Sequence, residues 1–198
     1  MTTFAIDPAY VARWPVQPFE PFGFGDEAYQ DVVYAAARAL MDRVGGRLLV
    51  DWGCGSAVKL RKYFTPAEVV GVDLPHIVQR HAQESPGYTF ADTGAAWLED
   101  VAPTVVLSAD VIEHVENPAF FLADLRALGG EWLVISTPAR EHMACNPMLG
   151  PPRNLCHARE WTMAEFAAFL EQQGVEIHEH TLIDPERATQ CVVGRFSP

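Results

Sequence analysis

The chain has 198 residues, which is the length of one domain with a substantial hydrophobic core. Apolar residues make up 49% of it and charged residues 20%, a balance typical of a globular protein. The formal net charge is −12, and only 14 residues are lysine or arginine. Because proteins that bind phosphate backbones carry a basic face, this charge disfavours a nucleic-acid partner and favours a small molecule.

Several absences in the sequence bear on location. No apolar run approaches the roughly 20 residues that cross a bilayer, so we expect no membrane partner. The N-terminal segment MTTFAIDPAY lacks the basic and apolar regions of a secretory signal. The four cysteines form no Cys-x-x-Cys pair and predict neither a disulfide framework nor a zinc ribbon. These features predict a cytoplasmic protein. The oligomeric state stays open, with a homodimer as one alternative.

The chain begins with a segment that cannot be helical. Residues 1–25 are rich in aromatic residues and contain too many prolines for a helix. We expect them to form an ordered arm that lies over the core or over a ligand, and residues 26–198 to form the main domain. Asp26 is expected to cap a helix that runs to about Arg43 and stops at Gly45.

From residue 47 onward, short apolar runs alternate with helical segments. The runs predict strands over 47–51, 68–72, 88–91, 104–108 and 131–136. Between them, helices are expected up to Phe64, from Pro75 and over 117–128. This alternation predicts right-handed βαβ units and an α/β fold with a doubly wound, mostly parallel sheet.

The last third of the chain predicts a loop, a helix and a hairpin. Residues 138–160 contain prolines and glycines and are too long for a plain connection, so they are expected to form a lid. Thr162 and Glu165 have the spacing of a capping box, which predicts a helix over 162–173. The tail is expected to add two strands, over 175–183 and 188–195, as an antiparallel hairpin at the sheet edge. These bring the predicted sheet to seven strands.

A glycine-rich turn follows the first predicted strand. In LLVDWGCGSA, residues 48–57, Gly53 and Gly55 lie where a strand gives way to a helix. Ligands of open α/β sheets bind beyond the carboxyl ends of the strands, and glycines there let the backbone approach the ligand. Val58 occupies a position where a dinucleotide fingerprint requires Gly or Ala, which disfavours a nicotinamide cofactor.

Acidic residues end three successive predicted strands. Asp51 precedes the glycine turn, where a carboxylate suits the amino group of S-adenosylmethionine (SAM) and repels phosphates. Asp73 is placed to accept hydrogen bonds from both hydroxyls of a ribose. Asp92 is placed to accept one from the amino group of an adenine. Three acidic strand ends in this order indicate a nucleoside ligand more strongly than the glycines alone.

With these motifs, residues 45–195 resemble the class I SAM-dependent methyltransferases. The resemblance implies a Rossmann-like methyltransferase domain. It departs at Ala57, where the family often has a third glycine. The cofactor-binding residues that we expect from the motifs and the resemblance are Asp51, Gly53, Cys54, Gly55, Asp73, Leu74, Asp92 and Ala109.

A second motif follows the fourth predicted strand. In SADVIEHVENP, Asp110, Glu113 and His114 are spaced to share one face of a helical turn. Two carboxylates and an imidazole can bind a divalent ion, with Mg or Mn favoured, or relay a proton. Alternatively, Glu113 and His114 cap and orient the following loop without any metal.

This segment is similar to the metal-binding acid-x-x-Glu-His segments of two methyltransferase groups. One is the ubiquinone-type O-methyltransferases, and the other is the small-RNA 3′-end 2′-O-methyltransferases, which add a distant histidine. His157, in HAREWTMAEF, resembles that histidine. The resemblance implies a metal site of Asp110, Glu113, His114 and His157, with Glu113, His114 and His157 as catalytic residues.

Positive charge is concentrated in the predicted lid. A basic lid over a pocket would suit a substrate with a carboxylate or a phosphate. The alternative is that these side chains pair with local neighbours. The residues concerned are Arg140, His142, Arg153, His157 and Arg159.

Together these features predict a SAM-dependent methyltransferase that O-methylates a small-molecule acceptor such as a metabolite, a sugar or a phenol. One alternative is a metal-dependent RNA 3′-end 2′-O-methyltransferase, against which the net charge argues. Another is a non-catalytic SAM-binding protein. A nicotinamide-dependent oxidoreductase is disfavoured by Val58 and by the absence of a Tyr-x-x-x-Lys motif.

Overall fold

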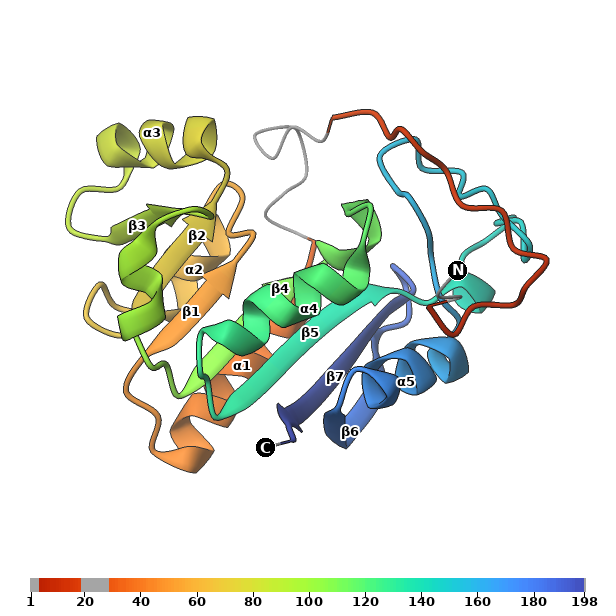
Figure 1. Cartoon of the computed structure of the whole chain (residues 1–198). Helices are drawn as coiled ribbons and strands as arrows, with labels where there is room; N and C mark the ends of the chain where they lie inside the picture. Colours follow the sequence, from red (N-terminus) through yellow and green to blue (C-terminus); the bar gives the residue numbers. More distant parts are fainter. Residues whose placement is uncertain (1–3, 19–28, 198) are drawn as a thin grey trace.

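A seven-stranded sheet organises the chain, of which the computed structural model describes residues 4–18 and 29–197 (Figure 1). The strand order is β3-β2-β1-β4-β5-β7-β6. The first five strands are parallel, and β7 runs antiparallel between β5 and β6. The predicted fold class, including the antiparallel hairpin, is confirmed. The strands are β1 Leu49–Trp52, β2 Val69–Asp73, β3 Thr89–Asp92, β4 Val105–Ala109, β5 Trp132–Pro138, β6 Val175–Asp184 and β7 Thr189–Phe196.

The helices lie close to the predicted positions. The first begins at Asp31, after Gln30 in a left-handed conformation, whereas the expected cap Asp26 lies outside the described residues. The capping box of Thr162 and Glu165 is present. Within the described part of the chain, no helix has the length and apolar character needed to cross a membrane. The helices are α1 Asp31–Val44, α2 Val58–Tyr63, α3 Pro75–Glu84, α4 Pro118–Ala127 and α5 Met163–Gln172, with 3₁₀ turns η1 Ala96–Asp100, η2 Ile112–His114 and η3 Arg140–His142.

Both faces of the sheet are covered, as the alternation of side chains along the strands requires. On one face, α4 and α5 pack against side chains such as Val50 and Val106. On the other face, α1 and α2 pack against Leu49 and Val105, the residues that precede Val50 and Val106 in the strands. With both faces of the sheet covered by these apolar layers, a ligand site is expected at the strand ends.

The described part of the N-terminal arm, residues 4–18, lies along the loop that follows β5 (Figure 1). Backbone amides of the arm donate to carbonyls of the loop, from Val11 to Leu149 at 2.8 Å and from Arg13 to Ala158 at 2.7 Å. The buried Trp161 donates from Nε1 to the carbonyl of Phe4 at 3.0 Å. The arm is therefore ordered on the loop. Residues 19–25 of the predicted arm lie outside the described residues.

The basic residues of the loop are used to hold the chain together. Arg140 is buried, and it donates to the Glu160 carbonyl at 2.7 Å and to Glu165 Oε2 at 2.6 Å. The buried Arg159 donates to two main-chain carbonyls at 2.8 and 2.7 Å and lies over the Phe4 ring. None of the five basic residues lines the cavity described next. The bonds of Arg140, Arg153 and Arg159 to nearby groups of the chain favour the alternative of local pairing over a basic lid that faces a substrate.

We expect Arg140→Ala to lower the free energy of unfolding by about 2–4 kcal/mol, because it leaves the Glu165 carboxylate and the Glu160 carbonyl without their buried donor. Urea denaturation would measure the change. Arg153→Ala is the matched control, since Arg153 is exposed, and its effect should stay within about 0.5 kcal/mol. Equal effects of the two substitutions would contradict this account of Arg140.

Candidate active site

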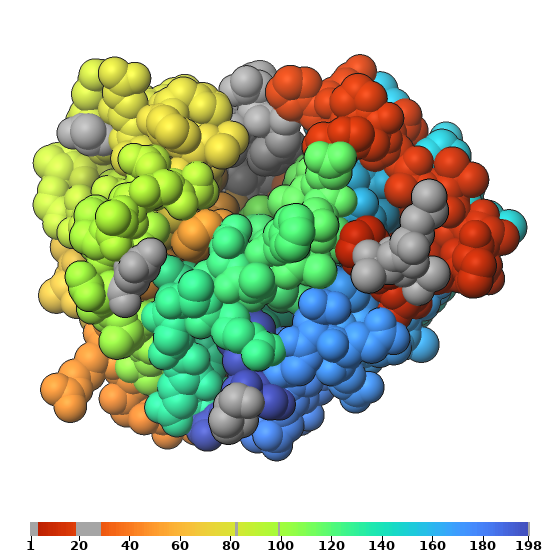
Figure 2. Space-filling view, viewed as in Figure 1, coloured from red at the N-terminus to blue at the C-terminus, as the bar shows by residue number. Residues whose placement is uncertain are grey.

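A cavity of about 460 Å³ opens where the parallel strands end. Its walls include the last residues of β1, β2 and β4, together with η2, α4 and the arm. In Figure 2 the surface is hollowed between the yellow residues around α3 and the green residues around η2 and α4. Of the residues expected from the sequence, it brings together Gly53, Cys54, Gly55, Asp73, Leu74, Ala109, Asp110 and His114.

The loop after β1 can take its shape only with glycine at residue 53. Gly53 has φ +88°, and a Cβ on it would lie 2.4 Å from Cγ2 of Val111. Its amide donates to the Val72 carbonyl at 2.8 Å, which ties the loop to β2. Ala57, which replaces the expected third glycine, adopts φ 55°. The loop backbone therefore forms a wall of the cavity without a side chain in the way.

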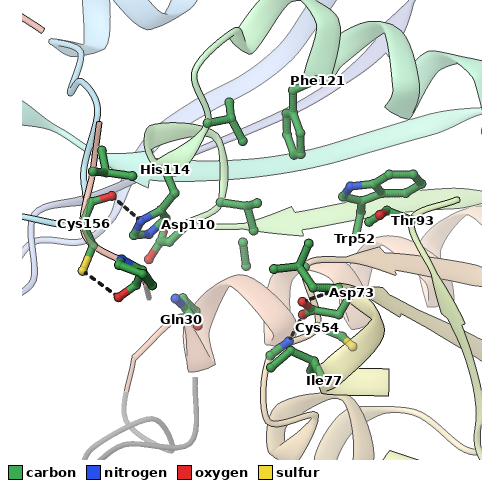
Figure 3. Close-up of a pocket in the computed structure, with 18 of the residues that line it drawn as sticks. Gln30, Trp52, Cys54, Asp73, Ile77, Thr93, Asp110, His114, Phe121 and Cys156 are labelled. Atoms are coloured by element: carbon green, nitrogen blue, oxygen red, sulfur yellow. Dashed lines mark hydrogen bonds between the residues drawn. The ribbon is translucent and has the colours of Figure 1, made fainter. Parts of the chain in front are cut away.

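Asp73 is a cavity-lining carboxylate whose two oxygens are both held by backbone amides (Figure 3). Its Oδ2 accepts from the Gly55 amide at 2.8 Å, and its Oδ1 accepts from the Leu74 amide at 2.7 Å. Burial raises the pKa of Asp73, and the two amide bonds act in the opposite direction. A carboxylate held in this way has a fixed orientation at the cavity wall.

The other two acidic strand ends do not line the cavity. Asp51 is fully buried behind it and accepts from the hydroxyl of Tyr34, a lining residue, at 2.8 Å. Burial raises the pKa of Asp51 to about 7, and the nearby charge of Asp73 adds to the effect. Asp92 accepts from the Gly94 amide at 2.9 Å, and its neighbour Thr93 lines the cavity instead.

The cavity has two ends of different character (Figure 3). At one end lie Trp52, Phe121 and Thr93, a mostly aromatic surface. At the other lie polar groups of Gln30, Asp110, His114 and Cys156, joined by Val16, Gln17 and Pro18 of the arm. Sequence reasoning missed Trp52 and Phe121. Trp52 directly precedes the glycine turn, and this position is a signal that could have identified it. Phe121 lies in the first turn of α4, where the sequence carries no such signal.

Asp110 does not belong to the helical turn on which it was expected. It has φ 53°, its amide donates to Ser136 on β5, and η2 begins only at Ile112. The Ser136 hydroxyl donates to Asp110 Oδ1 at 2.6 Å. Burial raises the pKa of Asp110. The predicted single face of Asp110, Glu113 and His114 is therefore not formed.

Glu113, His114 and His157 form a separate cluster. One potential ligand atom from each lies within 4.8 Å of the others, and Asp110 is not in this group. The two imidazoles meet edge-on, with ring centroids 4.8 Å apart. Of the three, only His114 lines the cavity, whereas Glu113 and His157 are buried behind it.

Hydrogen bonds fix the orientation of both histidines. His114 Nδ1 donates to the Cys156 carbonyl at 2.9 Å, and burial lowers the pKa of His114 to about 4. His157 Nδ1 donates to the buried Glu160 at 2.6 Å, and its Nε2 accepts from Asn154 at 2.9 Å. An Nδ1–H bond to a carbonyl or carboxylate is the contact that commonly orients histidine ligands of metals. The donor set therefore fits a divalent ion once Asn154 turns away.

No family model matches the sequence, and no curated protein matches it. Three solved structures illustrate the similarity of the fold. The small-RNA methyltransferase HEN1 aligns with a TM-score of 0.63 and 22% identity over 94% of this chain, which spans only 27% of the HEN1 chain. Magnesium protoporphyrin IX methyltransferase from Synechocystis PCC 6803 was solved with bound S-adenosylhomocysteine (SAH). It aligns with a TM-score of 0.62 and 19% identity over 88% of each chain.

The third is the 1,6-didemethyltoxoflavin N1-methyltransferase of Burkholderia thailandensis, with bound substrate and SAH. It aligns with a TM-score of 0.61 and 16% identity over 85% of this chain and 80% of that one. Likenesses at 16–22% identity establish the fold. The chain has the Rossmann-like methyltransferase fold that its sequence predicts.

The raised pKa of Asp51 makes a prediction about stability. A carboxyl has a pKa near 3.9 in an unfolded chain. Between about pH 4 and pH 7 this group is therefore ionised in the unfolded chain but still protonated in the folded protein, so the free energy of unfolding falls as the pH rises. Asp51→Asn cannot ionise, and its amide oxygen can still accept from Tyr34. At pH 8 we expect the variant to be more stable than the parent by up to about 4 kcal/mol, at one pKa unit per 1.4 kcal/mol.

Chemical denaturation of both proteins at pH 4 and pH 8 would measure this difference. The advantage of Asp51→Asn should shrink to about 0.5 kcal/mol at pH 4, where the parent carboxyl is protonated in the folded state and about half protonated in the unfolded state. An advantage of the same size at both pH values would contradict the titration of Asp51.

Proposed function

We propose that the protein is a SAM-dependent methyltransferase that O-methylates a small-molecule acceptor. The observation that carries the proposal is the fixed Asp73 carboxylate, which lies at the end of β2 beside the glycine loop and faces a cavity large enough for a nucleoside and an acceptor. The shared fold with proteins solved with SAH supports it.

The cavity offers each part of SAM a matching surface. Asp73 would accept from the ribose hydroxyls, and the aromatic end around Trp52 and Phe121 would hold the adenine. The glycine loop, with Asp51 behind it, would take the methionine part, because the loop leaves backbone exposed and the carboxylate favours an ammonium group. When bound, SAM supplies the methyl group on a sulfonium.

The polar end of the cavity would receive the acceptor. A hydroxyl acceptor must lose its proton during methyl transfer, and His114 is the imidazole that faces the cavity. With its pKa lowered to about 4, His114 is neutral at pH 7 and can accept a hydrogen bond, but it is a weak base. A divalent ion on Glu113, His114 and His157 would supply the missing acidification of the hydroxyl.

The charges around the cavity favour a small, uncharged or cationic acceptor over RNA. Asp73, Asp110 and Asp124 line it, and among the described residues Lys59 is the one lysine or arginine that does so. The arginines of the loop are bound to carbonyls and to Glu165. Methylation of an RNA 3′ end stays the second candidate, because of the Glu113, His114 and His157 cluster.

Calorimetric titration with SAM and with SAH tests the cofactor. We expect binding in the micromolar range, weakened at least tenfold by Asp73→Ala, because this substitution removes both the ribose acceptor and the partner of the Gly55 amide. Asp124→Ala, at the exposed edge of the same cavity, is the control and should bind SAH within about threefold of the parent. No binding of either compound would refute the proposal.

Titration with Mn²⁺ tests the metal cluster and can be read without any acceptor. We expect His157→Ala to abolish Mn²⁺ binding and Asp110→Asn to retain it, because Asp110 lies outside the cluster. Loss of Mn²⁺ binding in Asp110→Asn as well as in His157→Ala would show that Asp110 is a ligand. A parent protein that binds no Mn²⁺ and methylates fully in excess chelator would exclude the metal site.

An acceptor screen with tritiated SAM would then separate the two candidate functions. Phenols, sugars and acidic metabolites would be compared with a single-stranded small RNA. Transfer to a small molecule alone supports the proposal, whereas transfer to the RNA alone would replace it by the second candidate.

A further inference from the structure

His81 lies outside the cavity and touches its wall from behind. It is fully buried on α3, and its ring stacks on Phe90 of β3 with centroids 4.4 Å apart and planes 19° apart. Its Nε2 lies 2.6 Å from the carbonyl oxygen of Gly55. Because a carbonyl can only accept, Nε2 carries the proton and donates it.

Gly55 is thereby bound through both of its backbone polar groups. Its carbonyl accepts from His81, and its amide donates to Asp73 Oδ2 at 2.8 Å. The other oxygen of Asp73 accepts from the Leu74 amide at 2.7 Å. A continuous set of hydrogen bonds therefore links α3, the glycine loop and the carboxylate at the end of β2.

We propose that His81 is a positioning residue that sets the cofactor affinity by holding Gly55, and through Gly55 the carboxylate of Asp73. The inference rests on the proposed function, since Asp73 is the expected ribose-binding group. His81 itself makes no contact with the cavity. Its effect is indirect. The imidazole holds the Gly55 carbonyl, and the amide of the same residue orients the Asp73 carboxylate.

The physical basis is the cost of leaving a carbonyl that points at a fully buried imidazole without its donor. Removing the His81 N–H takes this donor from the Gly55 oxygen, and the loop would have to shift for the oxygen to find another. Gly55 has φ 54° and no side chain, so little else resists such a shift. A moved Gly55 amide would leave Asp73 with one fixing bond instead of two.

Three variants separate positioning from stability. His81→Phe keeps an aromatic ring against Phe90 and removes the donor. His81→Gln places an amide N–H near the position of Nε2 and restores it. Ser85→Ala is the matched control at the C-terminal cap of the same helix. Ser85 is buried, and its hydroxyl accepts from Arg61 Nη1 of α2 rather than from the glycine loop.

The measurements are SAH affinity by calorimetry and the thermal midpoint of the unliganded protein. We expect His81→Phe to weaken SAH binding about five- to tenfold, His81→Gln to bind within about twofold of the parent, and Ser85→Ala to lower the midpoint with no change in affinity. Equal SAH affinity in the parent and His81→Phe would overturn the inference. So would a failure of His81→Phe to fold while His81→Gln folds, since the role would then be structural.

Hydrogen exchange of the unliganded protein keeps the inference distinct from the proposed function. We expect the amides of residues 53–56 to exchange faster in His81→Phe than in the parent, and no such change in Ser85→Ala. If the parent binds neither SAM nor SAH, the proposed function fails and the affinity role of His81 fails with it, whereas the exchange rates still report whether His81 holds the loop. Unchanged exchange in His81→Phe would overturn that holding role.

Discussion

The structure of the site depends on one carboxylate that binds two backbone amides. Asp73 holds the amide of Gly55 on one oxygen and that of Leu74 on the other, so it joins the ends of β1 and β2. These strands are neighbours in a parallel sheet, and their carboxyl ends therefore meet at the same edge. The junction holds Gly55 of the glycine loop at the cavity wall, while the Gly53 amide is held separately by the Val72 carbonyl.

The buried acids around this junction lower the stability of the unliganded protein. Burial raises the pKa values of Asp51, Asp73, Asp110 and Glu113, so ionising each costs more in the folded chain than in the unfolded one. A cationic ligand or a metal ion would offset part of this cost. Such clusters of perturbed acids are typical of functional sites, because a site built for binding is not the arrangement of lowest energy without its ligand.

The sequence predicts the strands and the strand ends well because both are local signals. Asp73 follows its own apolar run, and its contact with Gly55 requires only that adjacent parallel strands end together. Asp110 was misplaced because its left-handed conformation is held by Ser136, which lies on another strand. The two readings of Arg140 stayed open for a similar reason, since its bond to Glu165 is a contact between segments that are 25 residues apart.

The same division between local and distant contacts explains how one fold can serve different acceptors. The part of the cavity that we propose for the cofactor is built from the ends of β1 and β2 and the loops that follow them, together with Phe121 of α4. The polar end, which we propose for the acceptor, also includes Val16 to Pro18 of the arm and Cys156 of the loop after β5, which lie outside the sheet. Structures with this fold act on substrates as different as a small RNA and a magnesium porphyrin. Because the arm is bound to the loop by the amides of Val11, Arg13 and Gln17, and neither segment touches Asp73, a change in either can reshape the polar end while the Asp73 junction stays intact.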